Sequence, residues 1–216
     1  MGILNVTPDS FSDGGLFTDP EKALHHAITL AEQGAAIIDI GGESTRPGAE
    51  PVQEEEELRR VIPVVERIRK ERPDLVISID TTKYEVARQA LQLGAHIIND
   101  VSGLSKEARF PELCEKFGAA YILMHTQGDP QSMQKNPVYD DVVEDLRTFF
   151  FFLIRVLNQA GVHNILIDPG IGFGKTLEHN LKLLAHLAIF RNFGYPLMIG
   201  ASRKSMIGKL LGGREA

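Results

Sequence analysis

Short apolar segments recur along the whole chain, and a polar residue lies at or near the end of each one. Seven of these segments are predicted to be strands: Gly2–Asn5, Ala36–Ile40, Val76–Asp80, His96–Asn99, Ala120–His125, Asn164–Asp168 and Pro196–Gly200. Their apolar residues are continuous, which is typical of parallel strands that are buried on both faces. Longer segments with helical spacing lie between them, at Asp19–Gln33, Gln53–Arg72, Lys83–Leu93, Lys106–Phe117, Tyr139–Ala160 and Thr176–Phe193. This alternation indicates an α/β fold with a parallel sheet.

Five glycines support the alternation independently of the apolar pattern. Each lies one to three residues before the next apolar segment, and they are Gly34, Gly94, Gly118, Gly161 and Gly194. This is the position at which a helix ends in the left-handed conformation, which glycine adopts without a steric penalty on Cβ. We therefore predict that a helix ends at each of these glycines.

The polar residues at the strand ends distinguish between the two parallel architectures. An open sheet binds its ligand at one switch point, so only the neighbouring strands need reactive residues. In a (β/α)₈ barrel the carboxyl ends of all strands meet at one mouth. Here every predicted strand carries such a group: Asn5, Asp39 with Glu43, Asp80, Asn99 with Asp100, His125, Asp168, and Ser202 with Lys204. We therefore predict one (β/α)₈ TIM-barrel domain over residues 1–216, with the eighth strand and helix missing from this chain.

The charge and the cysteine content exclude several classes of function. The 216 residues carry a net charge of −6 and no basic tract, so neither nucleic acid nor an anionic membrane is an expected partner. The single cysteine, Cys114, excludes an internal disulfide framework and a zinc site built from several cysteines. The N-terminus lacks the features of a signal peptide, and no apolar run approaches the length of a membrane span. A cytoplasmic location is expected.

The segment Pro169–Thr176 carries half of a phosphate-binding P-loop motif. Its G-K-T end is present, but Pro169 stands where the motif needs a glycine, and proline offers no backbone N–H. We therefore expect a glycine-rich turn that lets a flat ligand approach the backbone. Four strand ends supply two carboxylates, an amide and a cation, from Asp80, Asn99, Asp168 and Lys204. Each alone is more often a backbone cap, but together they suit a polar planar heterocycle that has both donors and acceptors.

The histidines do not form a set of metal ligands. Only His125 of the seven is expected to face the site, and a zinc site is therefore not predicted. A hard cation such as Mg²⁺ needs few protein ligands when the substrate carries phosphates. The side-chain oxygen of Asn5 could supply one of them.

Four consecutive phenylalanines lie in the predicted helix between the fifth and sixth strands, within Thr148–Ile154. Four successive residues span a full helical turn, so these side chains cannot all face the sheet. At least one is expected to meet a neighbouring helix or a second subunit. We predict a homodimer contact at this position.

Six motifs follow one another along the strand ends. They are N-V-T-P-D-S-F-S-D-G-G and G-G-E-S-T-R-P-G in two long polar loops, then I-D-T, I-I-N-D-V-S-G, D-P-G-I-G-F-G-K and S-R-K-S. In order, spacing and position they resemble the dihydropteroate synthase family over nearly the whole chain. That family is a (β/α)₈ barrel that joins a pterin-methyl diphosphate to 4-aminobenzoate in folate synthesis, and its 4-aminobenzoate site also takes sulfonamides.

The resemblance implies a role for particular residues. The residues implied to bind the pterin diphosphate are Thr45, Asp80, Asn99, Asp168 and Lys204, and those near 4-aminobenzoate are Phe11, Arg46, Phe173 and Ser205. The implied catalytic residues are Asp13, Arg46 and Lys204, and Asn5 would help to hold the Mg²⁺ that accompanies the diphosphate. In the implied chemistry the pterin C–O bond breaks first and leaves a methylene cation, which the amine of 4-aminobenzoate attacks.

The sequence departs from the family pattern near its C-terminal end. The family's eighth strand and helix, which carry an Arg-x-His pair, have no counterpart in these 216 residues. We expect a trimmed or incomplete chain of a full synthase. One alternative is a pterin-binding methyltransferase domain, which would share the pterin residues but has no need of the S-T-R-P loop or of S-R-K-S. A second is a non-catalytic pterin-binding relative that keeps the pocket. A third, a P-loop phosphotransferase, is disfavoured by Pro169.

Overall fold

A computed structural model describes residues 1–7, 20–45, 48–128, 133, 137–202 and 204–213 of the chain. Its sheet contains the strands β1 (Gly2–Asn5), β2 (Ile37–Gly41), β3 (Val76–Asp80), β4 (Ile97–Asp100), β5 (Ala120–Met124) and β6 (Ile165–Asp168). The helices are α1 (Pro20–Glu32), α2 (Glu54–Glu71), α3 (Tyr84–Gln92), α4 (Phe110–Phe117), α5 (Val142–Gln159), α6 (Leu177–Ala185), α7 (Leu187–Arg191) and α8 (Ser205–Leu210).

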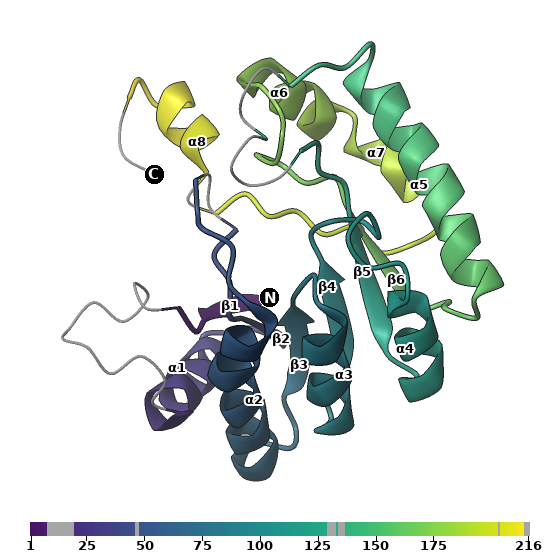
Figure 1. The fold of residues 1–216 in the computed structure, drawn as a ribbon. Helices are drawn as coiled ribbons and strands as arrows, with labels where there is room; N and C mark the ends of the chain where they lie inside the picture. The colour runs from purple at the N-terminus through teal and green to yellow at the C-terminus, as the bar shows by residue number, and fades with distance from the viewer. Residues whose placement is uncertain (8–19, 46–47, 129–132, 134–136, 203, 214–216) are drawn as a thin grey trace.

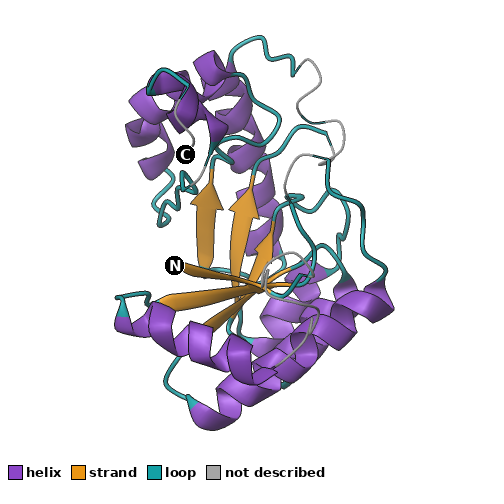
Figure 2. Cartoon of the chain, turned by 90° about the vertical axis from the view of Figure 1, so that its left-hand side faces the viewer, coloured by secondary structure: helices purple, strands orange, loops and turns teal. Residues whose placement is uncertain are grey.

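The strands pair in parallel and in the order in which they occur along the chain, from β1 to β6. Crossovers between parallel strands are almost always right-handed, so this strand order predicts connecting helices on one face of the sheet. Helices α1 to α4 accordingly pack side by side along the sheet (Figure 1). The sheet curls so strongly that the strands nearest the N-terminus run across the direction of the later strands (Figure 2). This sequential, curled, one-sided arrangement confirms the prediction of a barrel-type α/β fold.

The strand register separates an apolar face from a polar one. Residues that alternate along a strand point to opposite faces, and paired residues of parallel strands share a face. The face toward the helices carries ten side chains that are at most 2% exposed, namely Leu4, Ile38, Ile40, Ile77, Ile79, Ile98, Tyr121, Leu123, Ile165 and Ile167. These residues pack against the helices and form the core. The opposite face carries Asn5, Asp39, Ser78, Asp80, Asn99 and Asp168. Asp100 lies instead on the helix side, where the hydroxyl group of Tyr121 donates to it.

The prediction of a seventh strand at Pro196–Gly200 is wrong. Only Leu197 forms a bridge there, paired in parallel with Ile167 of β6. Two hydrogen bonds hold the segment, from Ile167 N to Pro196 O at 3.0 Å and from Met198 N to Ile167 O at 2.9 Å. β6 ends one residue later, at Asp168, where Pro169 cannot donate to a longer ladder. An apolar run alone could not reveal that limit.

The helix boundaries follow most of the signals in the sequence. All five glycines at the predicted helix ends have positive φ, between 65° at Gly118 and 100° at Gly34. Helix α1 begins with Pro20, the position at which proline loses no hydrogen bond. The predicted helix Thr176–Phe193 is instead divided at His186 into α6 and α7.

The phenylalanine run of α5 points in several directions, as its spacing predicts. Phe150 is fully buried, and its ring contacts the rings of Phe190 and Phe193 at centroid distances of 5.7 and 6.2 Å. Phe151 and Phe152 are 48% and 59% exposed. Among the described helices, none is long and apolar enough to cross a membrane.

Candidate active site

The predicted strand-end residues share the polar face of the sheet. Asn5 of β1 pairs with Gly41 of β2, Gly41 pairs with Asp80 of β3, and Asp80 pairs with Asn99 of β4, so all of them point to one face at one level. Asp168 of β6 lies on the same face, because its pairing with Met124 keeps it in phase with Asn99. Side chains that are distant in sequence therefore converge as a barrel mouth requires.

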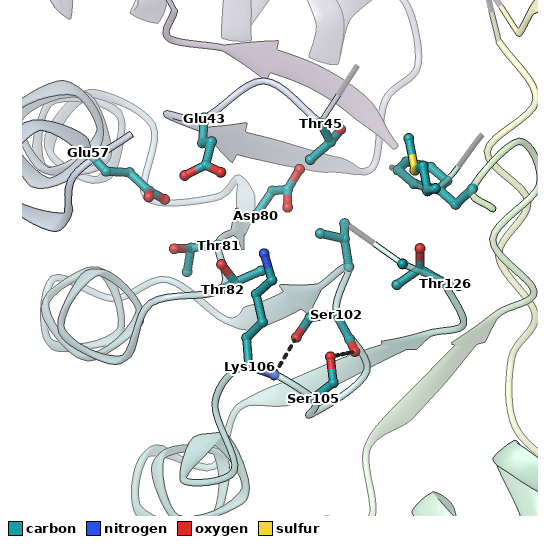
Figure 3. A pocket seen from close by; sticks show the side chains of 14 residues that line it. Glu43, Thr45, Glu57, Asp80, Thr81, Thr82, Ser102, Ser105, Lys106 and Thr126 are labelled. Atoms are coloured by element: carbon teal, nitrogen blue, oxygen red, sulfur yellow. Dashed lines mark hydrogen bonds between the residues drawn. The ribbon is translucent and has the colours of Figure 1, made fainter. Parts of the chain in front are cut away.

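A cavity lies beside this row and encloses about 580 Å³ of space that is continuous with solvent (Figure 3). Loops that follow five successive strands line it, together with Glu57 of α2. Three predicted site residues are in its wall, namely Thr45, Asp80 and Phe173. Other wall residues were not predicted from the sequence, among them Thr81, Thr82, Ser102, Ser105, Lys106 and Thr126.

Asp80 lies at the centre of a group of carboxyl groups. Burial raises its pKa well above the ordinary value, and the charges of Asp39, Glu57, Asp100 and Glu43 raise it further. The carboxyl group of Asp80 is drawn between Glu43 and Thr45 in the cavity wall (Figure 3). A donor or cation that enters the cavity would therefore be stabilised beside Asp80.

Lys83 holds two of these carboxylates together. Its Nζ donates to Oε2 of Glu43, which follows β2, and to Oε2 of Glu57 on α2. The Lys83 side chain is 19% exposed, that of Glu43 is 24% exposed, and that of Glu57 is fully buried. Glu43 also accepts from the backbone N–H of Val52 at 3.3 Å, which ties the two ends of the 43–52 loop. One ammonium group therefore joins α2 to the segment that precedes Thr45.

The far side of the site is formed by the glycine-rich turn after β6. Asp168 is 4% exposed and accepts from Gly170 N at 2.8 Å, and burial raises its pKa to about 6. Lys204, at the start of α8, interacts electrostatically with Asp168. The Nζ atom of Lys204 lies 3.9 Å from the centroid of the Phe173 ring, in a cation–π contact. Asp168, Phe173 and Lys204 thus form one neighbourhood.

The lysine of the G-K-T segment does not point out to a phosphate. Nζ of Lys175 donates to the carbonyl oxygens of His125, Gly170 and Phe173 at 3.1, 3.0 and 2.9 Å, and contacts Nδ1 of His125 at 3.1 Å. The residue is 3% exposed, and burial lowers its pKa to about 7. Lys175 therefore fastens the turn from inside, as the rejection of a P-loop predicts.

The expectation that His125 faces the site is wrong. Its ring packs edge-on against Phe149 of α5 at 4.8 Å, because residue 125 continues the side of β5 that faces the helices. Burial and the neighbouring Lys175 lower the pKa of His125 to about 3. His125 is therefore a neutral acceptor that supports the turn.

The glycine-rich turn after β6 lies so close to residues 125–127 that adding one methyl group to it should destabilise the protein. Gly170 has φ +65°, and a Cβ there would lie 2.0 Å from the carbonyl oxygen of His125. Gly170→Ala should lower the free energy of unfolding by more than about 3 kcal/mol in urea titration, since both strain and overlap must be relieved. Gly194 is the matched control, because its φ is +81° but nothing lies within 4 Å of a Cβ. Gly194→Ala should cost only about 1 kcal/mol; equal losses would contradict the close approach.

Of the remaining predicted site residues, the structure describes Ser205 and Asn5. Ser205 is the first residue of α8 and is exposed. Phe11, Asp13 and Arg46 lie outside the described residues. Asn5 is half-buried at the end of β1, and its side chain forms no hydrogen bond with another described residue. Its amide oxygen is a hard ligand of the kind that Mg²⁺ accepts beside phosphate and water, so the chemistry of this position fits the ion.

Comparison with known proteins gives consistent matches over the whole chain. The sequence signature of the family described as pterin binding enzyme matches residues 1–216. The dihydropteroate synthase of Escherichia coli K12 is 53% identical over 213 residues, which are 98% of this chain and 75% of that protein. The synthase of Synechocystis is 51% identical and is covered to 73%.

Solved structures agree with the sequence matches. The structure of Yersinia pestis dihydropteroate synthase with a sulfonamide drug complex has a TM-score of 0.90 and 49% identity, and covers 98% of this chain and 77% of that chain. The enzyme from Xanthomonas albilineans in complex with 7,8-dihydropteroate has a TM-score of 0.85 and 43% identity, with 99% and 76% covered. Both matches place the described sheet in the fold of those enzymes.

Proposed function

This chain belongs to the pterin-binding enzyme family, and we propose that its polar sheet face is where it carries out the dihydropteroate synthase reaction. In that reaction (7,8-dihydropterin-6-yl)methyl diphosphate and 4-aminobenzoate give 7,8-dihydropteroate and diphosphate, so the chain is a transferase of folate biosynthesis. The observation that carries this function is the convergence of Asp80, Asn99 and Asp168 on one face at the strand ends.

The polar face matches the hydrogen-bonding edges of a pterin. A pterin ring presents amino and N–H donors beside a carbonyl group and ring-nitrogen acceptors. In their ionised forms Asp80 and Asp168 accept only, Lys204 donates only, and Asn99 can do both. We place the ring between these four side chains, with Thr45 toward the diphosphate. The buried carboxylates supply charge-assisted hydrogen bonds, which discriminate strongly against rings that lack the donors.

The reaction needs positioning and charge stabilisation more than a protein nucleophile. The bond between the methylene carbon and the diphosphate oxygen breaks, and the electron pair leaves with the diphosphate. The electron-rich ring and the carboxylates around Asp80 stabilise the resulting cation. The amine of 4-aminobenzoate then attacks the methylene carbon and loses a proton. Cys114, the only cysteine, takes no part, because it is buried and its pKa is raised to about 12.

Mg²⁺ and 4-aminobenzoate complete the proposed site. When bound, Mg²⁺ would neutralise charge on the leaving diphosphate, and the Asn5 oxygen would be its protein ligand. We place 4-aminobenzoate near Phe173 and Ser205, with Phe11 and Arg46 from the two long loops. The sulfonamide drug complex of the Yersinia pestis enzyme supports the expectation that sulfonamides bind this chain as well.

Asp13 is expected to act on the developing cation more than on the bound substrate. Asp13→Ala should lower kcat by about 10²-fold, since a charge aimed at the transition state is lost. The Kd of the pterin diphosphate, measured by calorimetry without 4-aminobenzoate, should change less than about threefold. Equal losses in kcat and in affinity would contradict this role.

We also propose that the exposed aromatic surface of α5 pairs two copies of the chain. Phe151 and Phe152 contact each other at a centroid distance of 5.4 Å and border a groove that Ile189 and Phe193 also line. Exposed aromatic groups that adjoin a groove are typical of protein interfaces. Sedimentation of the chain at micromolar concentration should show a dimer, and Phe151→Asp with Phe152→Asp should give a monomer. Val138→Asp, at an apolar residue that is 67% exposed elsewhere, is the control; a monomeric unmodified chain would contradict the dimer.

The function is tested with the purified chain, dihydropterin-methyl diphosphate, Mg²⁺ and labelled 4-aminobenzoate. Labelled 7,8-dihydropteroate and an equal amount of diphosphate are the expected products. Binding of the pterin without any product would favour a non-catalytic pterin-binding protein. Transfer of a methyl group from a methylated folate to a corrinoid would favour the methyltransferase alternative.

A further inference from the structure

Asp39 is a buried carboxyl group that the proposed reaction does not place against either substrate. It lies on β2, on the polar face and one level below Asp80, in register with Ser78 of β3. It is 6% exposed, and its Oδ2 accepts a hydrogen bond from Nδ2 of Asn99 at 3.0 Å. Its Oδ1 has no hydrogen-bond partner among the described residues. Burying a carboxyl group without full hydrogen bonding destabilises the fold, which points to a functional role for Asp39.

The contact with Asp39 determines which way the Asn99 amide faces. An amide has one end that donates and one end that accepts, whereas an ionised carboxylate accepts only. The reverse orientation would bring the amide oxygen within about 3 Å of a carboxylate oxygen, where the two would repel. The donor end of Asn99 therefore faces Asp39, and its oxygen must face elsewhere.

The oxygen of Asn99 is buried and lacks a partner. Asn99 is 6% exposed, and its Oδ1 forms no hydrogen bond within the described part of the chain. An unpaired buried acceptor destabilises the folded chain, and an N–H donor of a ligand would remove that cost. Burial raises the pKa of Asp39, but the neighbouring side chains of Ser78 and Asn99 counter part of the rise and favour the accepting form.

We propose that Asp39 is a positioning residue that fixes the Asn99 amide with its oxygen toward the pterin. The site then selects rings that present an N–H donor opposite Asn99 and rejects rings with an acceptor there. This inference rests on the proposed placement of the pterin over Asn99. It adds a specificity determinant that does not itself have to touch the substrate.

An exchange of the two side chains tests the proposal. Asn99→Asp alone places two carboxylates side by side and should raise the KM for the pterin diphosphate by about 100-fold, with little change in the KM for 4-aminobenzoate. Asp39→Asn alone should raise the pterin KM by about three- to tenfold, because it replaces a charge-assisted hydrogen bond and permits both amide orientations. In the double variant the new amide donates to the new carboxylate, whose other oxygen faces the ring. The double variant should recover at least tenfold of the increase in the pterin KM that Asn99→Asp causes.

Asp140→Asn is the matched control, because it makes the same change from carboxylate to amide at an exposed residue outside the sheet. It should leave both KM values unchanged. The side-chain amide signals of Asn99 in ¹⁵N NMR give a second readout without catalysis, and should shift in Asp39→Asn but not in Asp140→Asn.

Two results would overturn the positioning role: losses that simply multiply in the double variant, or an unchanged amide signal in Asp39→Asn. If the unmodified chain bound pterin but formed no dihydropteroate, the proposed function would fail instead. The positioning role of Asp39 would then be tested by calorimetry, which compares the Kd of the pterin alone in the two single variants and in the double variant.

Discussion

Asp168→Asn is expected to weaken binding of the pterin diphosphate by about 10²–10³-fold. Asp168 is 4% exposed, and in the proposed site its carboxylate accepts two N–H groups of the ring. Each charge-assisted hydrogen bond contributes about 1.5–3 kcal/mol, and asparagine would replace one acceptor with a donor that faces a donor. Calorimetry with the pterin substrate measures the loss. Asp140→Asn, at an exposed carboxylate, is the control and should leave the affinity unchanged.

The same substitution should make the protein more stable. Burial raises the pKa of Asp168 from 3.8 to about 6, so the ionised form that is present at pH 7 is disfavoured in the folded chain. The folded state binds more protons than the unfolded state between these two values, and stability therefore falls as pH rises through that range. A neutral amide avoids this cost, and Asp168→Asn should gain about 1–3 kcal/mol at pH 7 in urea titration. A loss of affinity with a gain in stability separates function from folding.

Pterin binding should weaken as the pH falls, because the pKa of Asp168 is raised. Below about pH 6 the Asp168 carboxyl is protonated and loses an acceptor, so pterin affinity should fall about tenfold for each pH unit. Asp80, whose pKa is also raised, adds to the same trend. The slope should be shallower in Asp168→Asn. An affinity that stayed constant from pH 7 to 5 would contradict an accepting role for either carboxylate.

Local signals in the sequence were sufficient for the sheet and for its polar face. The alternation of apolar segments and glycines predicted β1 to β6, because each signal acts within a few residues of its cause. The strand-end rule placed Asp80, Asn99 and Asp168 on one face, because parallel strands share the direction of their carboxyl ends. The seventh segment looked the same in sequence, but a ladder depends on the hydrogen-bonding partners that a neighbouring strand offers.

Contacts between side chains that are distant in sequence could not be predicted in this way. His125 ends a predicted strand as Asp168 does, but β5 stops at Met124, which pairs with Asp168. His125 is one residue further on, and that one residue of phase places its side chain on the opposite face. Glu57 is the last of four consecutive glutamates and reads as a solvated helix start, yet it is fully buried. One signal was available: Lys83 stands directly before a helix, where the dipole disfavours a cation. A cation in that position indicates that carboxylates lie nearby.

Lys83→Met is expected to lower the free energy of unfolding by about 3–5 kcal/mol, a large fraction of the stability of an ordinary domain. Its ammonium is the partner of the fully buried Glu57 and of Glu43, and no other cation of the described residues forms an ion pair with either carboxylate. Thermal unfolding should shift down by about 10 °C or more, at about 2–4 °C per kcal/mol for a chain of this length. Lys182→Met, which breaks a surface pair with Asp141, should cost less than about 1 kcal/mol.

A second substitution separates the two effects of Lys83. Lys83→Met with Glu57→Leu removes the unpaired buried charge and should recover most of the lost stability, because apolar residues can replace a buried ion pair at little cost. A Lys83→Met chain within about 1 kcal/mol of the unmodified chain would contradict the buried pair. Glu43 stays unpaired in the double variant and still acts on Asp80. Pterin affinity should therefore stay lowered after stability returns, because the ammonium balances the charge around Asp80 as well as joining α2 to the loop of Thr45.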